Sequence, residues 1–363
     1  MKITRVQLAE CRVPLPHILK LASTQITTRN YVAIRVETDA GIIGEALGYT
    51  RGTPLVESLE MASRQIIGMD PLMRGEIIGK LENSNVPGRA SFTRAVSLLD
   101  IACWDILAKQ ARLPLYALLG GFRQSANVTA VAGYYMDLRS LDDIADEVGR
   151  LQDSGYTRIK IMLKGDDNVF DLRYVKAVTA RAPGACAADA HWSWSSMTDA
   201  QRLCSQIDDL GLNFIEDPFA AADWKLTHQL QKTLSTPVAA GEDVLGTRTL
   251  KDLVEGIGIL RVDATTCGGV TGAIEAIHHA SAAGRNVLPH VFASLHVHFA
   301  CSFPCVEGVE YIPEYSGADP LAALMKNPPV VAGGQMSLPC EPGIGIVLDW
   351  ESIEKTAARA IVI

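Results

Sequence analysis

The chain has 363 residues, of which 48% are apolar and 20% charged, so it can bury a large core and is too weakly charged for a disordered protein. Its formal net charge of −8 argues against a nucleic-acid partner, which would need a basic surface. No apolar run approaches the roughly 20 residues of a membrane span, and the N-terminus lacks the apolar core of a signal peptide. We therefore expect a cytoplasmic protein that binds neither nucleic acid nor membrane.

The first third of the chain has the pattern of an α+β domain. Alternating apolar residues predict three short strands, at residues 2–14, 30–38 and 42–48. The polar, turn-like stretch 15–29 predicts a loop of the kind that can cover a site. Helical periodicity then dominates three segments, at residues 54–67, 73–83 and 90–111.

From about residue 127 onward, short apolar strands alternate with amphipathic helices. Eight such strands read "VTAVAGY", "RIKIML", "ACAAD", "NFIE", "VAA", "ILRVD", "NVLPH" and "GVEYI". Parallel strands need crossover connections, which a helix between successive strands supplies. A doubly wound sheet is one solution, but eight regular units favour a closed barrel.

The tail returns to strands and turns over residues 329–350, and we expect it to pack on the N-terminal domain. The expected fold class is α/β, a modified (β/α)8 TIM-type barrel with an α+β N-terminal capping domain that the C-terminal tail completes. The expected boundaries are residues 1–122 for the capping domain, 123–315 for the barrel and 316–363 for the returning segment.

The polar residues of the expected barrel fall in step with its strands. Seven of them lie at or just after the end of an apolar strand, namely Lys160, Asp189, Glu216, Glu242, Asp263, His290 and Glu310. The C-terminal ends of barrel strands meet at one mouth, where active sites lie, so all seven should face the same space. One acidic residue after a strand is often only a helix N-cap, but glutamate is a poor cap and seven residues in step are hard to explain by capping.

Three consecutive strands end in the carboxylates Asp189, Glu216 and Glu242. Hard oxygen ligands suit Mg²⁺ better than zinc, and no histidine or cysteine belongs to this set. The sequence therefore predicts a Mg²⁺ site, at which Mn²⁺ could substitute.

Several segments resemble a known family. They are "FIEDP" (214–218), "AGED" (240–243), "DATTCGGVTG" (263–272), "LPH" (288–290) and "VEY" (309–311). As a set they look like the barrel motifs of the mandelate racemase and muconate lactonizing enzyme group of the enolase superfamily. The segment "SLLDIACWDILAK" (97–109) similarly resembles the helix that precedes the barrel in that group. The resemblance runs in order from residue 2 to about residue 350.

The resemblance implies a role for each matching residue. The three carboxylates would hold Mg²⁺, which would bind the carboxylate of a substrate. His290 would be the general base, oriented and made more basic by Asp263. Glu310 would hydrogen-bond the same substrate carboxylate, and Lys160 would be the first lysine of the family's Lys-x-Lys pair. Such a site suits removal of the proton α to a carboxylate, because its charges stabilise the enediolate that forms.

Some positions depart from the family pattern. Met162 stands in place of the second lysine, the base on the face opposite the histidine, and a thioether takes no proton at neutral pH. Lys164, two residues on, could reach the site or be a solvated lysine at a helix entry. Thr266 stands where muconate lactonizing enzymes and dipeptide epimerases carry a lysine base, which argues against those two activities.

His191 follows Asp189 by two residues, at a position where many relatives carry Asn. A histidine there resembles the acid-sugar dehydratases of the family, which protonate a departing β-hydroxyl; the alternative is an outward-facing loop histidine. The expected reaction is dehydration of a hydroxy acid to a 2-keto-3-deoxy acid. A racemase, epimerase or cycloisomerase with the same first half-reaction is the second interpretation, and a non-catalytic metal- or ligand-binding relative is the third.

The expected partners are a small carboxylic acid as substrate and further copies of the chain in a homo-oligomer. Contacts to the distal end of the substrate are expected from residues 15–29 and from the surroundings of Tyr49 and Arg51.

Overall fold

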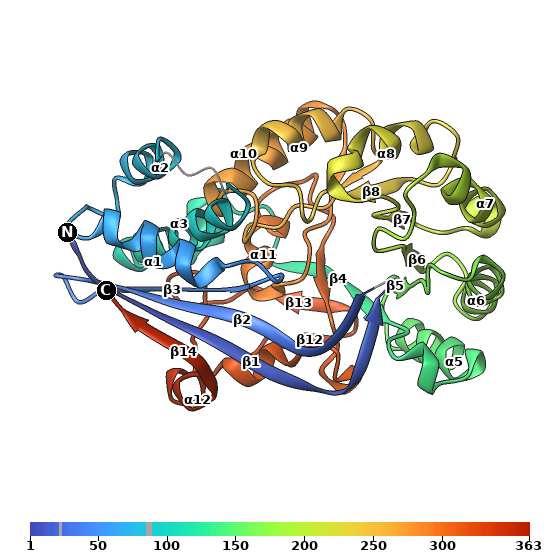
Figure 1. Cartoon of the computed structure of the whole chain (residues 1–363), viewed down its shortest axis with the longest axis horizontal. Coiled ribbons are helices and arrows are strands. Elements are labelled where there is room, and N and C mark those ends of the chain that lie inside the picture. The colour runs from blue at the N-terminus through green and yellow to red at the C-terminus, as the bar shows by residue number, and fades with distance from the viewer. Residues whose placement is uncertain (22–23, 85–88) are drawn as a thin grey trace.

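The structure is a computed structural model and describes residues 1–21, 24–84 and 89–363. An antiparallel sheet with its helices lies at the left of Figure 1, and a barrel lies at the right. The sheet has the strand order β14-β1-β2-β3, with bounds β1 (Ile3–Leu21), β2 (Thr24–Thr38), β3 (Ile43–Tyr49) and β14 (Ala357–Val362). Across the described residues, no helix has both the length and the apolarity that crossing a membrane requires.

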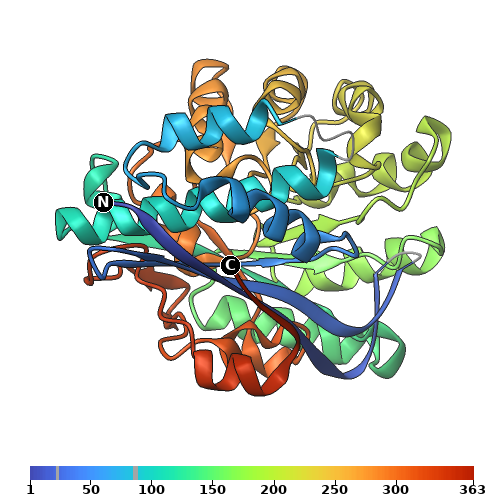
Figure 2. The same ribbon diagram turned by 60° about the vertical axis from the view of Figure 1, so that its left-hand side comes forward.

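The helices of the N-terminal part cover one face of this sheet, and the C-terminal helix covers the other (Figure 2). They are α1 (Leu55–Ile66), α2 (Arg74–Glu82), α3 (Arg89–Ala111) and α4 (Leu115–Leu118), and the C-terminal one is α12 (Trp350–Thr356). The helix α3 packs on β3 so closely that a Cβ at Gly44 would lie 2.1 Å from the carbonyl oxygen of Ala102. The three helices predicted from periodicity in this part are thus confirmed.

The expected loop over residues 15–29 is wrong for the described residues. The strands β1 and β2 run on as a long antiparallel ribbon, in which Leu19 pairs with Ile26 and Leu21 with Thr24. Residues 22 and 23 lie outside the described part. Leu19 and Leu21 are buried while Lys20 is exposed, which is strand alternation. The two preceding prolines, and a register shift between Pro14 and Leu19, hide this alternation in the sequence.

The second part is the predicted barrel of parallel strands. Its strands are β4 (Ser125–Ala132), β5 (Arg158–Met162), β6 (Cys186–Asp189), β7 (Ile215–Glu216), β8 (Val238–Ala240), β9 (Ile259–Leu260), β10 (Asn286–Val287) and β11 (Val309–Tyr311). They pair in sequence order from β4 to β10, and β11 pairs with β4. Val287 exchanges backbone hydrogen bonds of 2.8 and 2.9 Å with Cys305 and Glu307, which closes the ring between β10 and the segment before β11.

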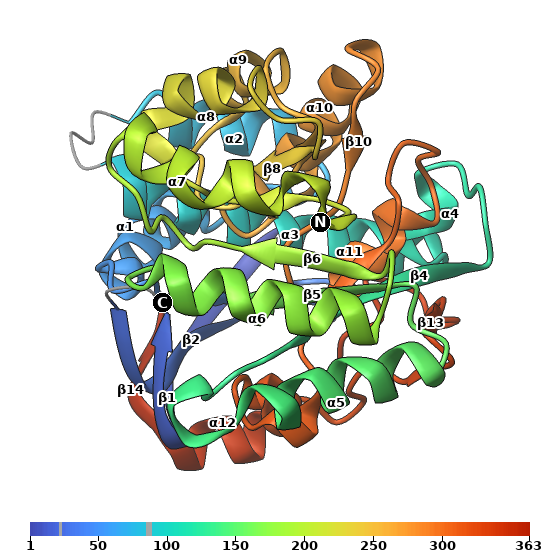
Figure 3. The ribbon, with the colours of Figure 1, turned by 90° about the vertical axis from the view of Figure 1, so that its right-hand side faces the viewer.

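Helices between the strands form the outer layer of the barrel, and Figure 3 shows several of them side by side. They are α5 (Leu141–Asp153), α6 (Asn168–Arg181), α7 (Met197–Ile207), α8 (Trp224–Gln231), α9 (Thr247–Val254), α10 (Gly269–Ala282) and α11 (Ala293–Ala300). The helix α10 also packs on α3, where the carboxylate of Asp100 accepts hydrogen bonds from the backbone N–H and the hydroxyl of Thr271. The two parts of the molecule therefore share a packed boundary.

We expected residues 329–350 to pack on the N-terminal domain. In the structure, the C-terminal tail instead contacts both the barrel and the capping sheet. The strands β12 (Val331–Ala332) and β13 (Gln335–Ser337) form a hairpin, and β13 pairs with residues 125–127 of β4. Residues 125–127 precede the part of β4 that pairs with β5 and β11. Their backbone groups are therefore not used by those two strands and can pair with the antiparallel strand β13. Residues after 343 do return to the capping side, and β14 completes its sheet.

Asp105 of α3 ties this returning segment to the capping sheet. Its fully buried carboxylate accepts hydrogen bonds from the backbone N–H groups of Glu45 (3.0 Å) and Ile344 (2.9 Å) and from Lys109 Nζ (2.6 Å). Replacing Asp105 by Ala leaves these donors unpaired, so we expect the free energy of unfolding to fall by about 2–4 kcal/mol in urea titrations. Glu37→Ala, which removes an exposed partner of Arg5, should cost less than about 1 kcal/mol. Equal losses in the two variants would contradict the proposed tie.

Candidate active site

The seven polar residues that follow the barrel strands lie together at the mouth of the barrel. None exposes more than 6% of its surface. Burial of so many charged groups requires close pairing, because an unpaired charge is costly away from water. The pairs show how the site is built.

Lys160 lies at the centre of one group. Its Nζ is 3.0 Å from Asp189 Oδ2, 2.9 Å from Glu216 Oε1 and 2.9 Å from Glu310 Oε2. Arg261, fully buried on the segment after β9, lies 3.0 Å from Glu216 and also pairs with Glu310. The sequence analysis missed Arg261, although an arginine inside the apolar run "ILRVD" is a signal of a buried partner.

Glu310 is an acceptor in this arrangement. Burial alone would raise its pKa, but the charges of Arg261 and Lys160 hold the pKa at about 2. An ionised Glu310 has no proton to donate, whereas the role implied by the family resemblance was a hydrogen bond to a substrate carboxylate. That role requires either a proton on Glu310 or a bridging donor such as Lys160.

A second group contains the carboxylates that lie nearest to one another. Oxygen atoms of Glu216, Asp217 and Glu242 all lie within 4.8 Å. We expected Asp189 in this set, but its Oδ2 faces Lys160 and its Oδ1 accepts from the backbone N–H of His191. The sequence analysis missed Asp217, because strand alternation would point its side chain away from the face on which Glu216 lies. In the structure its backbone is left-handed, with a φ of 40°, so it does not follow that alternation.

This carboxylate group fits a divalent cation. Glu216 Oε2 is buried and has no hydrogen-bond partner. Burial raises the pKa of Glu216 to about 8, although the charges of Arg261 and Lys160 act to lower it. Burial also raises the pKa of Asp217 well above its usual value, and neighbouring carboxylates add to both increases. Acids held this close together in a buried place favour a bound positive charge, and oxygen donors suit Mg²⁺ or Mn²⁺.

His290 and Asp263 form the pair that the sequence predicts. His290 Nδ1 lies 2.9 Å from Asp263 Oδ2, and Asp263 Oδ1 accepts hydrogen bonds of 2.7 and 2.8 Å from the N–H and hydroxyl of Thr265. His290 Nε2 lies 3.3 Å from Arg51 Nη2. Because a guanidinium can only donate, Nε2 is the acceptor and Nδ1 carries the proton. This tautomer places the lone pair on Nε2, the nitrogen that accepts from Arg51 here and that has the lone pair a substrate proton requires.

His191 is buried, which excludes the outward-facing alternative. It lies in a left-handed backbone with a φ of 43° and stacks on Trp192 at 4.5 Å. Burial lowers the pKa of His191 to about 4, so the ring is neutral near pH 7. Trp194, in contrast, packs in the apolar layer between the barrel strands and their outer helices.

His191 and Trp192 line a cavity of about 550 Å³ between the barrel mouth and the β1–β2 ribbon. Its other polar lining residues include Thr28, Arg29, Asn30, Arg51 and Arg94. A volume of this size accommodates a small organic acid. Residues 24–30 of the ribbon line this cavity, so part of the segment that we expected to cover the site borders it, as strand and not as loop.

The positions that depart from the family pattern offer no second base. Met162 is buried and pairs in register with Asp189. The ammonium of Lys164 lies 3.6 Å from Asp166 and stands over the ring of Phe170, so its partners belong to the following loop and α6 and not to the seven site residues. Thr266 donates its hydroxyl hydrogen to the carbonyl oxygens of Glu242 and Asp263, so it holds the backbone at the barrel mouth.

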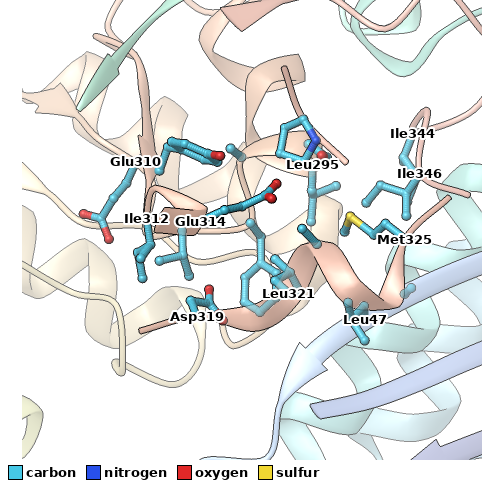
Figure 4. Close-up of a pocket in the computed structure, with 18 of the residues that line it drawn as sticks. Leu47, Leu295, Glu310, Ile312, Glu314, Asp319, Leu321, Met325, Ile344 and Ile346 are labelled. Atoms are coloured by element: carbon cyan, nitrogen blue, oxygen red, sulfur yellow. The ribbon is translucent and has the colours of Figure 1, made fainter. Parts of the chain in front are cut away.

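A smaller cavity of about 40 Å³ lies beside this site (Figure 4). Leu47, Leu295, Ile312, Leu321 and Met325 are among the apolar side chains that surround it. It is too small for an organic acid and too apolar for the chemistry described above.

Two family descriptions match the chain. "Mandelate racemase / muconate lactonizing enzyme, N-terminal domain" matches residues 3–120, and "Enolase C-terminal domain-like" matches residues 143–352. Together they span most of the chain, so the protein belongs to the mandelate racemase / muconate lactonizing enzyme family of the enolase superfamily. The resemblance in the sequence motifs predicted this family, and the prediction is confirmed.

Relatives with known activities are only distantly similar. The chain is 23% identical to an N-succinyl-L-Arg/Lys racemase of Bacillus cereus, over 98% of each chain. It is 26% identical to an L-talarate/galactarate dehydratase of Salmonella typhimurium, over 77% of this chain and 72% of the relative. The crystal structure of L-talarate dehydratase from Polaromonas sp. JS666 in complex with Mg and L-glucarate superposes with a TM-score of 0.87 at 26% identity, covering 100% and 99% of the two chains. These relatives support an enzyme, and they include both a lyase and an isomerase.

Proposed function

We propose that the protein is a Mg²⁺-dependent enzyme that removes the proton α to the carboxylate of a small acid. The observation that carries this proposal is the position of His290. Its unprotonated Nε2 lies 3.4 Å from Glu242, at the edge of the carboxylate group. A base beside a cation site is what abstraction of such a weakly acidic proton requires.

His290, Asp263 and Lys160 each have a defined task in removal of the α-proton. His290 Nε2 takes the α-proton, and Asp263 stabilises the imidazolium through Nδ1. Lys160 contributes positive charge near the carboxylate of the substrate. Mg²⁺ held by the carboxylate group would supply Lewis-acid stabilisation of the negative charge that develops there.

Glu216 and Glu242 belong to both the expected ligand set and the carboxylate group in the structure. Asp189 is the third ligand in the family pattern, and we propose it for this role. Asp217 is the alternative, because its oxygen lies within 4.8 Å of the other two.

The overall reaction that we propose is dehydration of an acid sugar to a 2-keto-3-deoxy acid. His191 is buried on the wall of the cavity, and in its imidazolium form, which an anionic substrate beside it would favour over the neutral ring, it can protonate a departing β-hydroxyl. A racemase needs a second acid–base group on the opposite face, where Met162 stands. The dehydratase among the relatives supports this choice, and the racemase among them keeps a racemase or epimerase as the second candidate.

Replacing His191 by Asn tests the dehydration step. His191 would act after proton abstraction, so the variant should still exchange the α-proton in deuterated solvent. Formation of the keto acid should fall by roughly 10²–10⁴-fold, as for loss of a general acid. A library of aldonic and aldaric acids, assayed for keto-acid formation and for deuterium uptake, measures both rates.

The control is His279→Asn, which changes a partly exposed histidine of α10 that pairs with Glu275. Both rates should stay near those of the unmutated protein. Retained dehydration in His191→Asn would remove this residue from the mechanism. Racemised substrate without loss of water, in the unmutated protein, would favour the racemase or epimerase.

A further inference from the structure

Arg51 reaches from the turn after β3 into the carboxylate group. Its Nη2 lies 3.0 Å from Glu242 Oε1, 3.3 Å from His290 Nε2 and 3.8 Å from Asp243 Oδ2. The guanidinium therefore contacts both an expected metal ligand and the atom expected to take the proton. While Arg51 holds this position, its guanidinium competes with a metal ion for Glu242 and occupies the lone pair of His290 Nε2.

Arg51 is the cation of this group that has room to leave. The side chain of Lys160 is 3% exposed and that of Arg261 is fully buried, and both are enclosed by carboxylates. The side chain of Arg51 is 22% exposed and borders the 550 Å³ cavity. Its turn belongs to the capping part, not to the barrel, so the barrel framework need not change when it moves.

A second acceptor for Arg51 already exists. Asp243 Oδ2 is buried and has no hydrogen-bond partner, while Oδ1 of the same residue is held by Arg94. At 3.8 Å from Arg51 Nη2, this oxygen lies a short side-chain rotation beyond hydrogen-bond distance. Moving to it would satisfy Asp243 Oδ2 and release both Glu242 and His290.

We propose that Arg51 is a gating residue whose guanidinium competes with Mg²⁺ for Glu242 and is displaced when Mg²⁺ binds. The guanidinium and the metal ion compete for Glu242, so the free energy of metal binding includes the cost of moving Arg51. The same movement uncovers His290 Nε2, which couples metal binding to exposure of the base. This inference rests on the proposed metal site and adds a regulating residue to it.

Calorimetric titration with MgCl₂, without substrate, tests the competition. Arg51→Gln removes the competing charge, and we expect the dissociation constant for Mg²⁺ to fall by roughly 10- to 100-fold. Arg51→Lys keeps the charge on a shorter, differently shaped group. Its dissociation constant for Mg²⁺ should lie between those of the unmutated protein and Arg51→Gln. The control is Arg29→Gln, which removes a charge lining the same cavity but bonded to the carbonyl oxygen of Ala318. Its dissociation constant should change by less than about threefold.

The outcomes separate this inference from the proposed metal site. Glu242→Gln should abolish Mg²⁺ binding in the unmutated and the Arg51→Gln backgrounds. Unchanged or weaker binding in a folded Arg51→Gln variant, while the unmutated protein binds Mg²⁺, would overturn the gate and leave the site intact. Equal tightening in Arg51→Gln and Arg29→Gln would also overturn it, because general charge would then explain the effect. If neither the unmutated protein nor any variant binds Mg²⁺, both the gate and the proposed metal site would be overturned.

Discussion

Replacement of Glu216 by Gln should abolish turnover while the fold survives, and Glu242→Gln should do the same. Each change removes a carboxylate from the group that we propose binds Mg²⁺, together with the several kcal/mol of stabilisation that the ion supplies. That loss corresponds to a fall in kcat of roughly 10³–10⁵-fold. Keto-acid formation, measured with and without excess EDTA, checks the prediction, and thermal denaturation reports on the fold.

Asp189→Asn and Asp217→Asn distinguish the two candidates for the third ligand. The variant that loses Mg²⁺ binding in calorimetry identifies the ligand. Glu307→Gln is the matched control, because Glu307 lies before β11, at the opposite end of the barrel strand from the site, and pairs with Arg158. Full activity in excess EDTA would refute the metal assignment. Mg²⁺ binding without turnover on the whole acid library would instead favour a non-catalytic relative.

Exchange of the substrate α-proton with deuterated solvent should stop in His290→Asn. His290 Nε2 is the ring nitrogen that we propose takes the proton, and Met162 offers no base on the other face. The expected loss is roughly 10²–10⁴-fold. Asp263→Asn should slow exchange less completely, because the imidazole remains but loses the negatively charged acceptor that fixes its tautomer.

Proton NMR of the substrate in D₂O measures this exchange directly, without relying on product formation. His279→Asn again serves as the control and should exchange at the normal rate. Undiminished exchange in His290→Asn would show that another residue is the base. Lys164 would then be the next candidate, despite its contact with Asp166.

Local patterns predicted the course of the chain well where one period dominates. The helices α1 to α3 and the alternation of strands and helices after residue 127 follow directly from spacing of apolar residues. The ribbon at residues 15–29 could not be predicted in this way, because prolines and a register shift interrupt its alternation of buried and exposed residues. Its strand character depends on pairing between β1 and β2, in which Leu19 faces Ile26 and Leu21 faces Thr24, and not on a period within either strand.

By itself the sequence determined the fold class, the family and which polar residues end each barrel strand, since these depend on order and spacing along the chain. Only the tertiary structure decided which of these residues face one another. Arg261 joins Glu216 to Glu310, and Arg51 meets Glu242 and His290, across separations of 45 or more residues that no local period encodes. Asp217 joins the carboxylate group through a left-handed backbone that breaks strand alternation. The physical reason is that charge pairing follows distance in space, whereas periodicity reports only the direction in which a side chain leaves its own helix or strand.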